Sequence, residues 1–450
     1  MIGLNKIGLN QVQLNRLRLN APFPAYGKMA GGGGSGDGFP QLPGDVTRWH
    51  FGGLTNEMMA AMDDPRIEDA DHKGRFLSFK NFAWKEGSGI SDVYPGALVF
   101  DGVDDCGVCD NFPILTKEKG YTVVVLRQWD QDFLNTTLTG GLLSTRNYST
   151  GEGVAFEKIE SSNKGYWNLG AGGIIDFAKS PFTWQTSKQY NNVGILKGDK
   201  NHGKPLCVGC GLSGGQQCGR FAIWELVFLD HDATEEELTK IKDYFVKTYP
   251  WLFPDQAWTV TGKTNEDKDR ATIANITGNG NDLVCLNLGF IEGSGYNEEG
   301  EYAGYLVTDG VDDKITSSTF EMGNDWTVIG DWELINTGKN DNAGIVKFDS
   351  IVIYNYNPIL INIKNGRNNL IPDQNTVNAI CSDGRIYSKD WKESIYNEET
   401  ESTSKNLLTI GYSGNSYTKI AFKDLAIYPT VLSKEDCIKA YNYLQTLKAK

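Results

Sequence analysis

The sequence predicts an all-β protein built from two tandem jelly-roll β-sandwiches, each closed by one C-terminal α-helix. First, a segment that reads Asp-Gly-Val-Asp-Asp occurs at residues 101–105 and again at residues 309–313. Second, a strand followed by a helix lies far downstream of each copy, and a repeat of about 200 residues is the size of a domain. Third, 52 glycines, only 14 prolines and 11% aromatic residues are typical of twisted antiparallel sheets with many turns.

The strands of the two copies follow the same order. An apolar strand precedes the acidic turn at residues 97–100 in the first copy and at residues 305–307 in the second. The late segments 220–226 and 419–425 also correspond, and each runs into a helix. Many strands followed by one helix predict two packed sheets, with the helix covering an edge or a face.

Both C-terminal helices carry recognisable start signals. Thr234 and Glu237 have the spacing of a capping box, and Ser433 with Asp436 caps the second helix. Apolar residues at helical spacing predict the buried stripes, which are Leu238, Ile241, Tyr244 and Phe245 in the first helix and Cys437, Ile438, Tyr441 and Leu444 in the second.

The chain begins with a segment that is unlike the rest. Residues 1–20 form four pentads, in each of which two apolar residues one position apart precede an asparagine. Such alternation favours a short strand, asparagine favours a turn, and so short a segment buries little surface alone. We therefore expect it to dock on another chain or on copies of itself, with a disordered leader as the alternative. The residues expected to form this anchor are Leu4, Asn5, Leu9, Asn10, Leu14, Asn15, Leu19 and Asn20.

These patterns divide the chain into four parts. Residues 1–26 are expected to be the anchor, and residues 27–38 a flexible glycine-rich linker. The two sandwiches are expected at residues 39–254 and 255–450.

The charge distribution limits the partners. The formal net charge of −14 disfavours nucleic acid or an anionic membrane as a partner. Residues 1–38 nonetheless carry four basic residues against one acidic residue, so the leader is expected to have a partner of its own. No apolar run is long enough to span a membrane, and no signal-peptide core is present.

Eight cysteines are present, five in the first copy and three at unmatched positions in the second. Duplicated disulfide domains would share their pairing, so reduced and mostly buried thiols are expected. One alternative is a zinc site, because two Cys-x-x-Cys pairs have zinc-knuckle spacing. The first pair follows the early strand and the second pair precedes the last strand, and these strands are often neighbours in a jelly roll. That site would use Cys106, Cys109, Cys207 and Cys210, although isolated thiols are the preferred interpretation and no cofactor is expected.

The acidic motif has two interpretations. Ca²⁺ is bound by clustered carboxylates and carbonyls, which Asp101, Asp104 and Asp105, or Asp309, Asp312 and Asp313, could supply. A tight turn is the preferred interpretation, because Asp-Gly suits a type I′ hairpin and the spacing of an EF-hand is absent.

Residues 98–105, the glycine-rich turns before the last strands, and the capped helices after them resemble the concanavalin A-like lectin/glucanase superfamily, in its laminin-G-like branch. The resemblance covers most of residues 40–450 and rests on short motifs in a specific order. It implies a jelly-roll sandwich that binds glycans or proteins.

The leader, linker and tandem sandwiches also resemble decoration or fibre proteins of tailed bacteriophages that infect gut Bacteroidales, including crAss-like phages. That resemblance implies a head-fibre, capsid-decoration or tail-associated adhesin, located in the virion after assembly in the host cytoplasm. Residues 1–26 would contact capsid or tail proteins, the protein would be a homo-oligomer, and the sandwiches would face cell-surface glycans.

No catalytic signature is found. The superfamily's glycosidases carry a strand with the spacing Glu-x-Asp-x-x-Glu, and no such run occurs. A non-enzymatic adhesin is therefore preferred over a free bacterial carbohydrate-binding protein and over a glycoside hydrolase. Exposed aromatic platforms beside polar residues would bind glycans, and the candidates in Gly-, Asn- and Ser-rich surroundings are Trp84, Trp167, Trp184 and Trp391. For each of the four, burial is the preferred interpretation, because tryptophan is highly buried on average.

Overall fold

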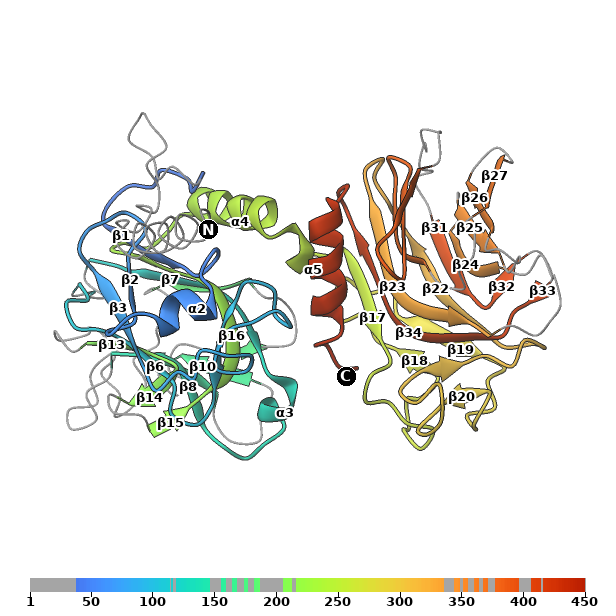
Figure 1. The fold of residues 1–450 in the computed structure, drawn as a ribbon, viewed down its shortest axis with the longest axis horizontal. Helices are drawn as coiled ribbons and strands as arrows, with labels where there is room; N and C mark the ends of the chain where they lie inside the picture. The colour runs from blue at the N-terminus through green and yellow to red at the C-terminus, as the bar shows by residue number, and fades with distance from the viewer. Residues whose placement is uncertain are drawn as a thin grey trace, which may run out of the picture.

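The protein consists of two β-sandwiches in tandem, which lie side by side in the computed structural model (Figure 1). The structure describes residues 38–113, 115, 119–145, 155–158, 164–167, 174–176, 182–186, 205–212, 216–335, 344–348, 351–354, 360–363, 367–370, 377–395, 406–413 and 416–449. The anchor and nearly all of the linker expected at the N-terminus lie outside these residues.

The first sandwich is formed by two sheets. We call the sheet that faces the second sandwich the inner sheet, and its order is β12 (Phe182–Thr186), β7 (Thr122–Trp129), β16 (Arg220–Leu229), β5 (Leu98–Asp101) and β4 (Gly89–Ile90), with β1 (Val46–His50) also paired to β16. The outer sheet has the order β11 (Ile174–Asp176), β10 (Lys164–Trp167), β9 (Ala155–Lys158), β8 (Gly140–Ser144), β13 (Leu206–Val208), β6 (Cys106–Cys109), β3 (Phe76–Lys80) and β2 (Arg66–Glu68). A short hairpin of β14 (Cys210–Leu212) and β15 (Gln216–Cys218) is attached to β8.

The second sandwich repeats this arrangement. Its inner sheet has the order β20 (Gly295–Tyr296), β21 (Leu306–Val307), β34 (Ile420–Tyr428), β23 (Thr327–Leu334), β28 (Val377–Cys381), β29 (Arg385–Ser388) and β30 (Glu393–Ile395), with β17 (Gln256–Thr259) paired to β34. Its outer sheet has the order β18 (Thr272–Ile273), β19 (Leu283–Leu286), β22 (Lys314–Phe320), β31 (Asn406–Ile410), β24 (Gly344–Phe348), β25 (Ile351–Tyr354), β26 (Leu360–Ile363) and β27 (Arg367–Leu370). The hairpin of β32 (Tyr412–Ser413) and β33 (Ser416–Tyr417) follows β31.

The two topologies coincide over the strands that they share, and the second inner sheet continues beyond β28 with β29 and β30. In the inner sheets, the order β12-β7-β16-β5-β4 corresponds to β28-β23-β34-β21-β20. In the outer sheets, the order β2-β3-β6-β13-β8-β9-β10-β11 corresponds to β18-β19-β22-β31-β24-β25-β26-β27. The predicted fold class, tandem β-sandwiches that each end in a helix, is confirmed.

The described residues contain four α-helices, namely α2 (Asn56–Ala60), α3 (Gln131–Leu134), α4 (Glu235–Thr248) and α5 (Lys434–Leu444). The predicted capping box at the start of α4 is present, and the Ser433 side chain accepts from the Asp436 backbone N–H at the start of α5. None of the described helices has the length and apolar character that a membrane span needs.

Strand alternation gives each inner sheet two apolar faces. In β16, Phe221 and Ile223 point into the first sandwich, whereas Ala222 and Trp224 point to its back. The backs of both inner sheets, together with α4, the 3₁₀ helix η2 (Pro250–Leu252) and α5, form one continuous apolar core. We call this the shared core, and Figure 1 shows α5 lying in it between the two sandwiches.

Helix α5 contacts both sandwiches. The Tyr443 ring lies edge-on to Trp224 with centroids 6.1 Å apart, and its hydroxyl donates to Gln128 Oε1 at 3.1 Å. The Tyr428 hydroxyl of the second inner sheet donates to the Trp251 carbonyl at 3.0 Å. The sandwiches are therefore docked through buried contacts rather than joined by a free tether.

The buried stripe of α5 differs from the predicted one. Cys437 and Leu444 are buried as expected, but Ile438 and Tyr441 are only half-buried. Ala440 and Tyr443 are buried in addition. The reason is that α5 is covered from two sides, and the sequence pattern of one helix does not reveal the second covering surface.

The first sandwich buries an ion pair behind its inner sheet. The Glu225 carboxylate accepts from Arg48 Nη1 at 3.2 Å, and both side chains are at most 1% exposed. The hydroxyls of Tyr244 and Tyr249 donate to Glu225 Oε1 at 3.1 and 3.0 Å, and His50 Nδ1 lies 2.9 Å from the same oxygen. These partners compensate the carboxylate for its lost hydration.

The second sandwich keeps the carboxylate but not the cation. Asp424 occupies the register position of Glu225, and Ala257 occupies that of Arg48. Burial raises the pKa of Asp424 to about 7, against the lowering effect of its hydrogen bond with Thr259. The buried acid is thus ion-paired in the first copy, whereas burial favours its protonated form in the second copy.

We expect Arg48→Ala to lower the free energy of unfolding by about 3–5 kcal/mol, because it leaves Glu225 buried without its cation. The measurement is chemical denaturation followed by tryptophan fluorescence. Arg66→Ala is the control, because Arg66 forms an exposed pair with Asp64 and its loss should cost less than about 1 kcal/mol. Equal effects of the two substitutions would contradict the assignment.

Candidate binding sites

The duplicated acidic motif forms the same closed turn in both copies. The Asp101 carboxylate accepts from the backbone N–H groups of Val103 at 2.7 Å and Asp104 at 3.3 Å. The Asp105 carboxylate reaches back and accepts from the Asp101 N–H at 2.9 Å. In the second copy the matching distances are 2.7, 3.3 and 2.8 Å.

This turn is not a hairpin, contrary to the type I′ expectation. Strands β5 and β6, which it joins, belong to the inner and outer sheets respectively, and β21 and β22 are divided in the same way. The turn is therefore a corner between the two layers. Gly102 and Gly310 both have φ of +78°, and a Cβ at Gly102 would lie 2.9 Å from Arg220 Cβ.

A second duplicated loop packs against each corner and was not recognised in the sequence. Residues 81–90 match residues 287–296 at asparagine, glutamate, serine and glycine positions. The Ser88 hydroxyl donates to Asp105 Oδ1 at 3.0 Å, and the Ser294 hydroxyl donates to Asp313 Oδ2 at 2.8 Å. The sequence signal that could have revealed this loop is the pattern Asn-x-x-aromatic-x-Glu-Gly-Ser-Gly, which both ten-residue segments share.

Each of these loops carries an aromatic residue in a left-handed backbone conformation. Trp84 has φ of +48° and its counterpart Phe290 has φ of +51°. Such conformations are costly for bulky residues and cluster at ligand-binding positions. Trp84 is half-buried and stacks on Phe82 with centroids 5.0 Å apart, while the Arg270 guanidinium lies 5.2 Å from the Phe290 ring centroid. We call each loop with its turn a corner site.

The other predicted aromatic platforms have different positions. Trp391 also has a left-handed backbone, with φ of +57°, but packs at the margin of the shared core, 5.7 Å from the Tyr441 ring. Trp167 lies in β10 and Trp184 in β12, and the described features there are limited to the backbone. Ligand binding by these four tryptophans stays a prediction.

The corner sites contain the acidic groups considered for calcium. Asp101, Asp104 and Asp105, and likewise their counterparts in the second copy, offer carboxylate oxygens within 4.8 Å of one another. Burial is the largest influence on Asp105 and raises its pKa to about 7, although hydrogen bonds from the Asp101 backbone and Ser88 oppose the rise. Two of the three carboxylates in each cluster, those of Asp101 and Asp105 and of Asp309 and Asp313, accept the backbone hydrogen bonds that close the turn.

Three of the four cysteines considered for zinc lie together, and the fourth does not. Cys106, Cys207 and Cys210 form a buried cluster, whose fourth member is Cys218. Cys109 points instead into the core of the first sandwich. Cys106 and Cys109 are three residues apart in one strand and so face opposite sides, which the Cys-x-x-Cys spacing alone does not reveal.

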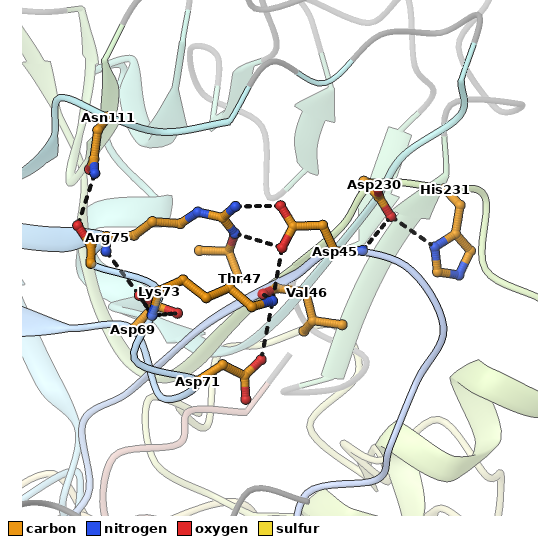
Figure 2. A network of polar contacts seen from close by, with 11 residues as sticks. Asp45, Val46, Thr47, Asp69, Asp71, Lys73, Arg75, Asn111, Asp230 and His231 are labelled. Carbon is orange, nitrogen blue, oxygen red and sulfur yellow. Dashed lines mark hydrogen bonds and ion pairs between the residues drawn. The ribbon is translucent and has the colours of Figure 1, made fainter. Parts of the chain in front are cut away.

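A charged network fixes the start of the first strand, as Figure 2 shows. The Asp45 carboxylate accepts from Lys73 Nζ at 2.8 Å and from the Arg75 guanidinium, and the Asp45 N–H donates to Asp230 Oδ1 at 2.8 Å. Burial alone would raise the pKa of Asp45, but the bonds and charges of Arg75 and Lys73 outweigh it and lower the pKa.

The predicted anchor residues, Leu4 to Asn20, lie outside the described part of the chain.

Comparisons with known proteins identify no family. No protein-family model matches the chain, and no curated protein is significantly similar to it. Among solved structures, the Trypanosoma rangeli sialidase in complex with sialic acid is 10% identical, with a TM-score of 0.31 over 84% of this chain and 68% of that chain. The receptor binding domain of botulinum neurotoxin type G is 12% identical, with a TM-score of 0.26 over 42% of this chain and 50% of that chain. Likenesses of this strength transfer neither an activity nor a ligand.

The raised pKa of Asp105 predicts a pH dependence. Folded Asp105 keeps its proton up to about pH 7, whereas an unfolded aspartate loses it near pH 4. The folded state therefore binds more protons in this window, and this contribution to stability falls as the pH rises through it. We expect Asp105→Asn to remove that slope from the free energy of unfolding measured between about pH 4 and pH 8. Asp104→Asn, at an exposed neighbour, is the control, and parallel profiles for Asp105→Asn and wild type would contradict the prediction.

Proposed function

We propose that the protein is a non-enzymatic virion surface protein, a head fibre, capsid decoration or tail-associated adhesin, that presents two laminin-G-like sandwiches to glycans or other host-surface molecules. The observation that carries the proposal is the duplicated corner site, which recurs with the same hydrogen bonds in two sandwiches of one topology. A duplicated surface feature suits multivalent binding, in which weak sites gain strength from effective concentration.

The docking of the sandwiches supports the same function. Because α5 and the shared core hold the two copies together, the two corner sites keep a fixed spacing. A fixed spacing limits the conformational entropy lost when both sites engage one surface. The acidic body, with its net charge of −14, fits a glycan or protein ligand better than a nucleic acid or an anionic membrane.

A non-enzymatic role agrees with how the acids are used. The Asp101 and Asp105 carboxylates close their own turn, as their counterparts do in the second copy, whereas a glycosidase needs two carboxylates placed on either side of a substrate bond. Turnover of a polysaccharide by the purified protein would instead favour the glycoside hydrolase.

The proposed attachment is through residues 1–26, with capsid or tail proteins as partners and a homo-oligomer as the assembled form. The network around Asp45 supports a tether at this end of the body. It clamps the start of β1 to the β2–β3 connection and to the end of β16, so tension from the leader would be spread over several strands.

We expect deletion of residues 1–38 to abolish incorporation into virions while leaving the melting temperature of the body unchanged. The measurement is the amount of protein that sediments with particles, after co-expression with the capsid and tail proteins proposed as its partners. A milder variant replaces Leu4, Leu9, Leu14 and Leu19 with alanine, and its matched control replaces Gln11 and Gln13 with alanine. Normal incorporation of the deletion variant would refute the anchor, whereas failure of the full-length protein to sediment with particles would favour the free carbohydrate-binding protein.

We expect Trp84→Ala to weaken glycan binding about 2- to 13-fold, the loss that corresponds to one aromatic contact of roughly 0.5–1.5 kcal/mol. The measurement is a glycan array followed by titration of the best ligand, with Phe290→Ala testing the second copy. Phe76→Ala, at an exposed aromatic residue on β3, is the control. Unchanged binding in Trp84→Ala, Trp167→Ala, Trp184→Ala and Trp391→Ala would remove aromatic platforms from the proposal.

A further inference from the structure

Four thiols converge on the outer sheet of the first sandwich. They come from four neighbouring strands, β6, β13, β14 and β15, and each residue is at most 6% exposed. They form an apolar cluster of their own, separate from the sandwich core. Its members are Cys106, Cys207, Cys210 and Cys218.

Strand geometry explains why these four meet. Leu206 and Val208 of β13 point into the sandwich core, so Cys207 between them points to the opposite face. Gly209 then turns the chain with φ of +96°, at a position where a Cβ would lie 2.3 Å from the Phe100 ring. The turn leads into the β14–β15 hairpin, which lies over the same face.

The four thiols form a chain of pairwise interactions. Cys106 interacts with the thiols of Cys207 and Cys210, and Cys210 interacts with Cys218, its direct cross-strand partner in the hairpin. Among the described residues, however, the groups of three or more ligand atoms that lie within 4.8 Å of one another are the two aspartate clusters. A bound ion would therefore require the four sulfurs to draw closer by side-chain rotation.

The second copy serves as an internal comparison. Tyr412 and Tyr417 are cross-strand partners in the matching hairpin, as Cys210 and Cys218 are in the first. The other two positions follow from the strands, because Lys314 starts β22 as Cys106 starts β6, and Thr409 precedes the last residue of β31 as Cys207 precedes that of β13. The residues that replace the four cysteines are thus Lys314, Thr409, Tyr412 and Tyr417.

These replacements hold the second hairpin by other means. The two tyrosine rings lie 4.9 Å apart, and Lys314 Nζ lies 5.1 Å from the Tyr412 ring centroid. In the second copy, a cation–π contact and a contact between two rings therefore link the β32–β33 hairpin to strand β22. In the other copy, all four matching positions are cysteine.

We propose that Cys106, Cys207, Cys210 and Cys218 bind one structural zinc ion. Four sulfur ligands with no open position suit Zn²⁺ in a tetrahedral structural site, with Zn–S distances of about 2.3 Å. The ion would fasten the β14–β15 hairpin to β6 and β13, the role that the tyrosines and lysine have in the second copy. The set contains Cys218 in place of Cys109, unlike the set suggested by Cys-x-x-Cys spacing.

The first test is metal content. The full-length protein, expressed in zinc-supplemented medium and purified without chelator, should contain one zinc per chain by elemental analysis. Replacement of zinc by Co²⁺ should give thiolate-to-cobalt charge transfer and the absorption of tetrahedral cobalt. Zinc-free protein with no cobalt spectrum, or a disulfide between Cys210 and Cys218 in freshly purified protein, would overturn the proposal.

Substitutions test the ligand set. Cys218→Ser should lose the ion, and Cys109→Ser should keep it; the reverse result would overturn the assignment. Because single serines in this cluster could fail to fold, a second variant transplants the residues of the other copy, as Cys106→Lys, Cys207→Thr, Cys210→Tyr and Cys218→Tyr. This variant should fold without zinc and keep its melting temperature in chelator, whereas chelator should lower that of the wild type by several degrees. A wild-type melting temperature that chelator does not change would contradict a structural ion.

Discussion

The arrangement of the whole molecule depends on the shared core between the two inner sheets. In most sandwiches one face of each sheet is wet, but here both faces of each inner sheet are apolar. Helix α5 fills the space between the backs, and its Tyr443 reaches across to Trp224 and Gln128. The apolar backs thus fix the order of layers, and the corner sites are held by a frame that includes both copies.

The two copies place different side chains at matching structural positions. At the buried acid in the last strand, the first copy provides Arg48 and the second leaves Asp424 inclined to hold a proton. At the hairpin over the outer sheet, one copy gathers thiols and the other gathers Tyr412, Tyr417 and Lys314. The Ser88 and Ser294 hydrogen bonds to the corner aspartates, in contrast, are present in both copies.

Much of the fold could be predicted because its signals are local. The repeated acidic turn, the strand order and the caps at Thr234 and Ser433 each depend on neighbouring residues. The remaining features depend on contacts between distant segments. Whether Cys109 or Cys218 joins the thiol cluster depends on strand faces and pairing, and the extra burial of Tyr443 depends on a sandwich more than 200 residues away in the chain. The left-handed backbone at Trp84 has no residue-type signal, because glycine is the usual occupant.

The double-sided apolar character of the inner sheets has an evolutionary consequence. A descendant that lost either copy would expose the back of the remaining sheet together with one side of its helix, a surface prone to aggregation. Each half therefore depends on the other for solubility, because the other copy covers its apolar back, whatever either half contributes to recognition.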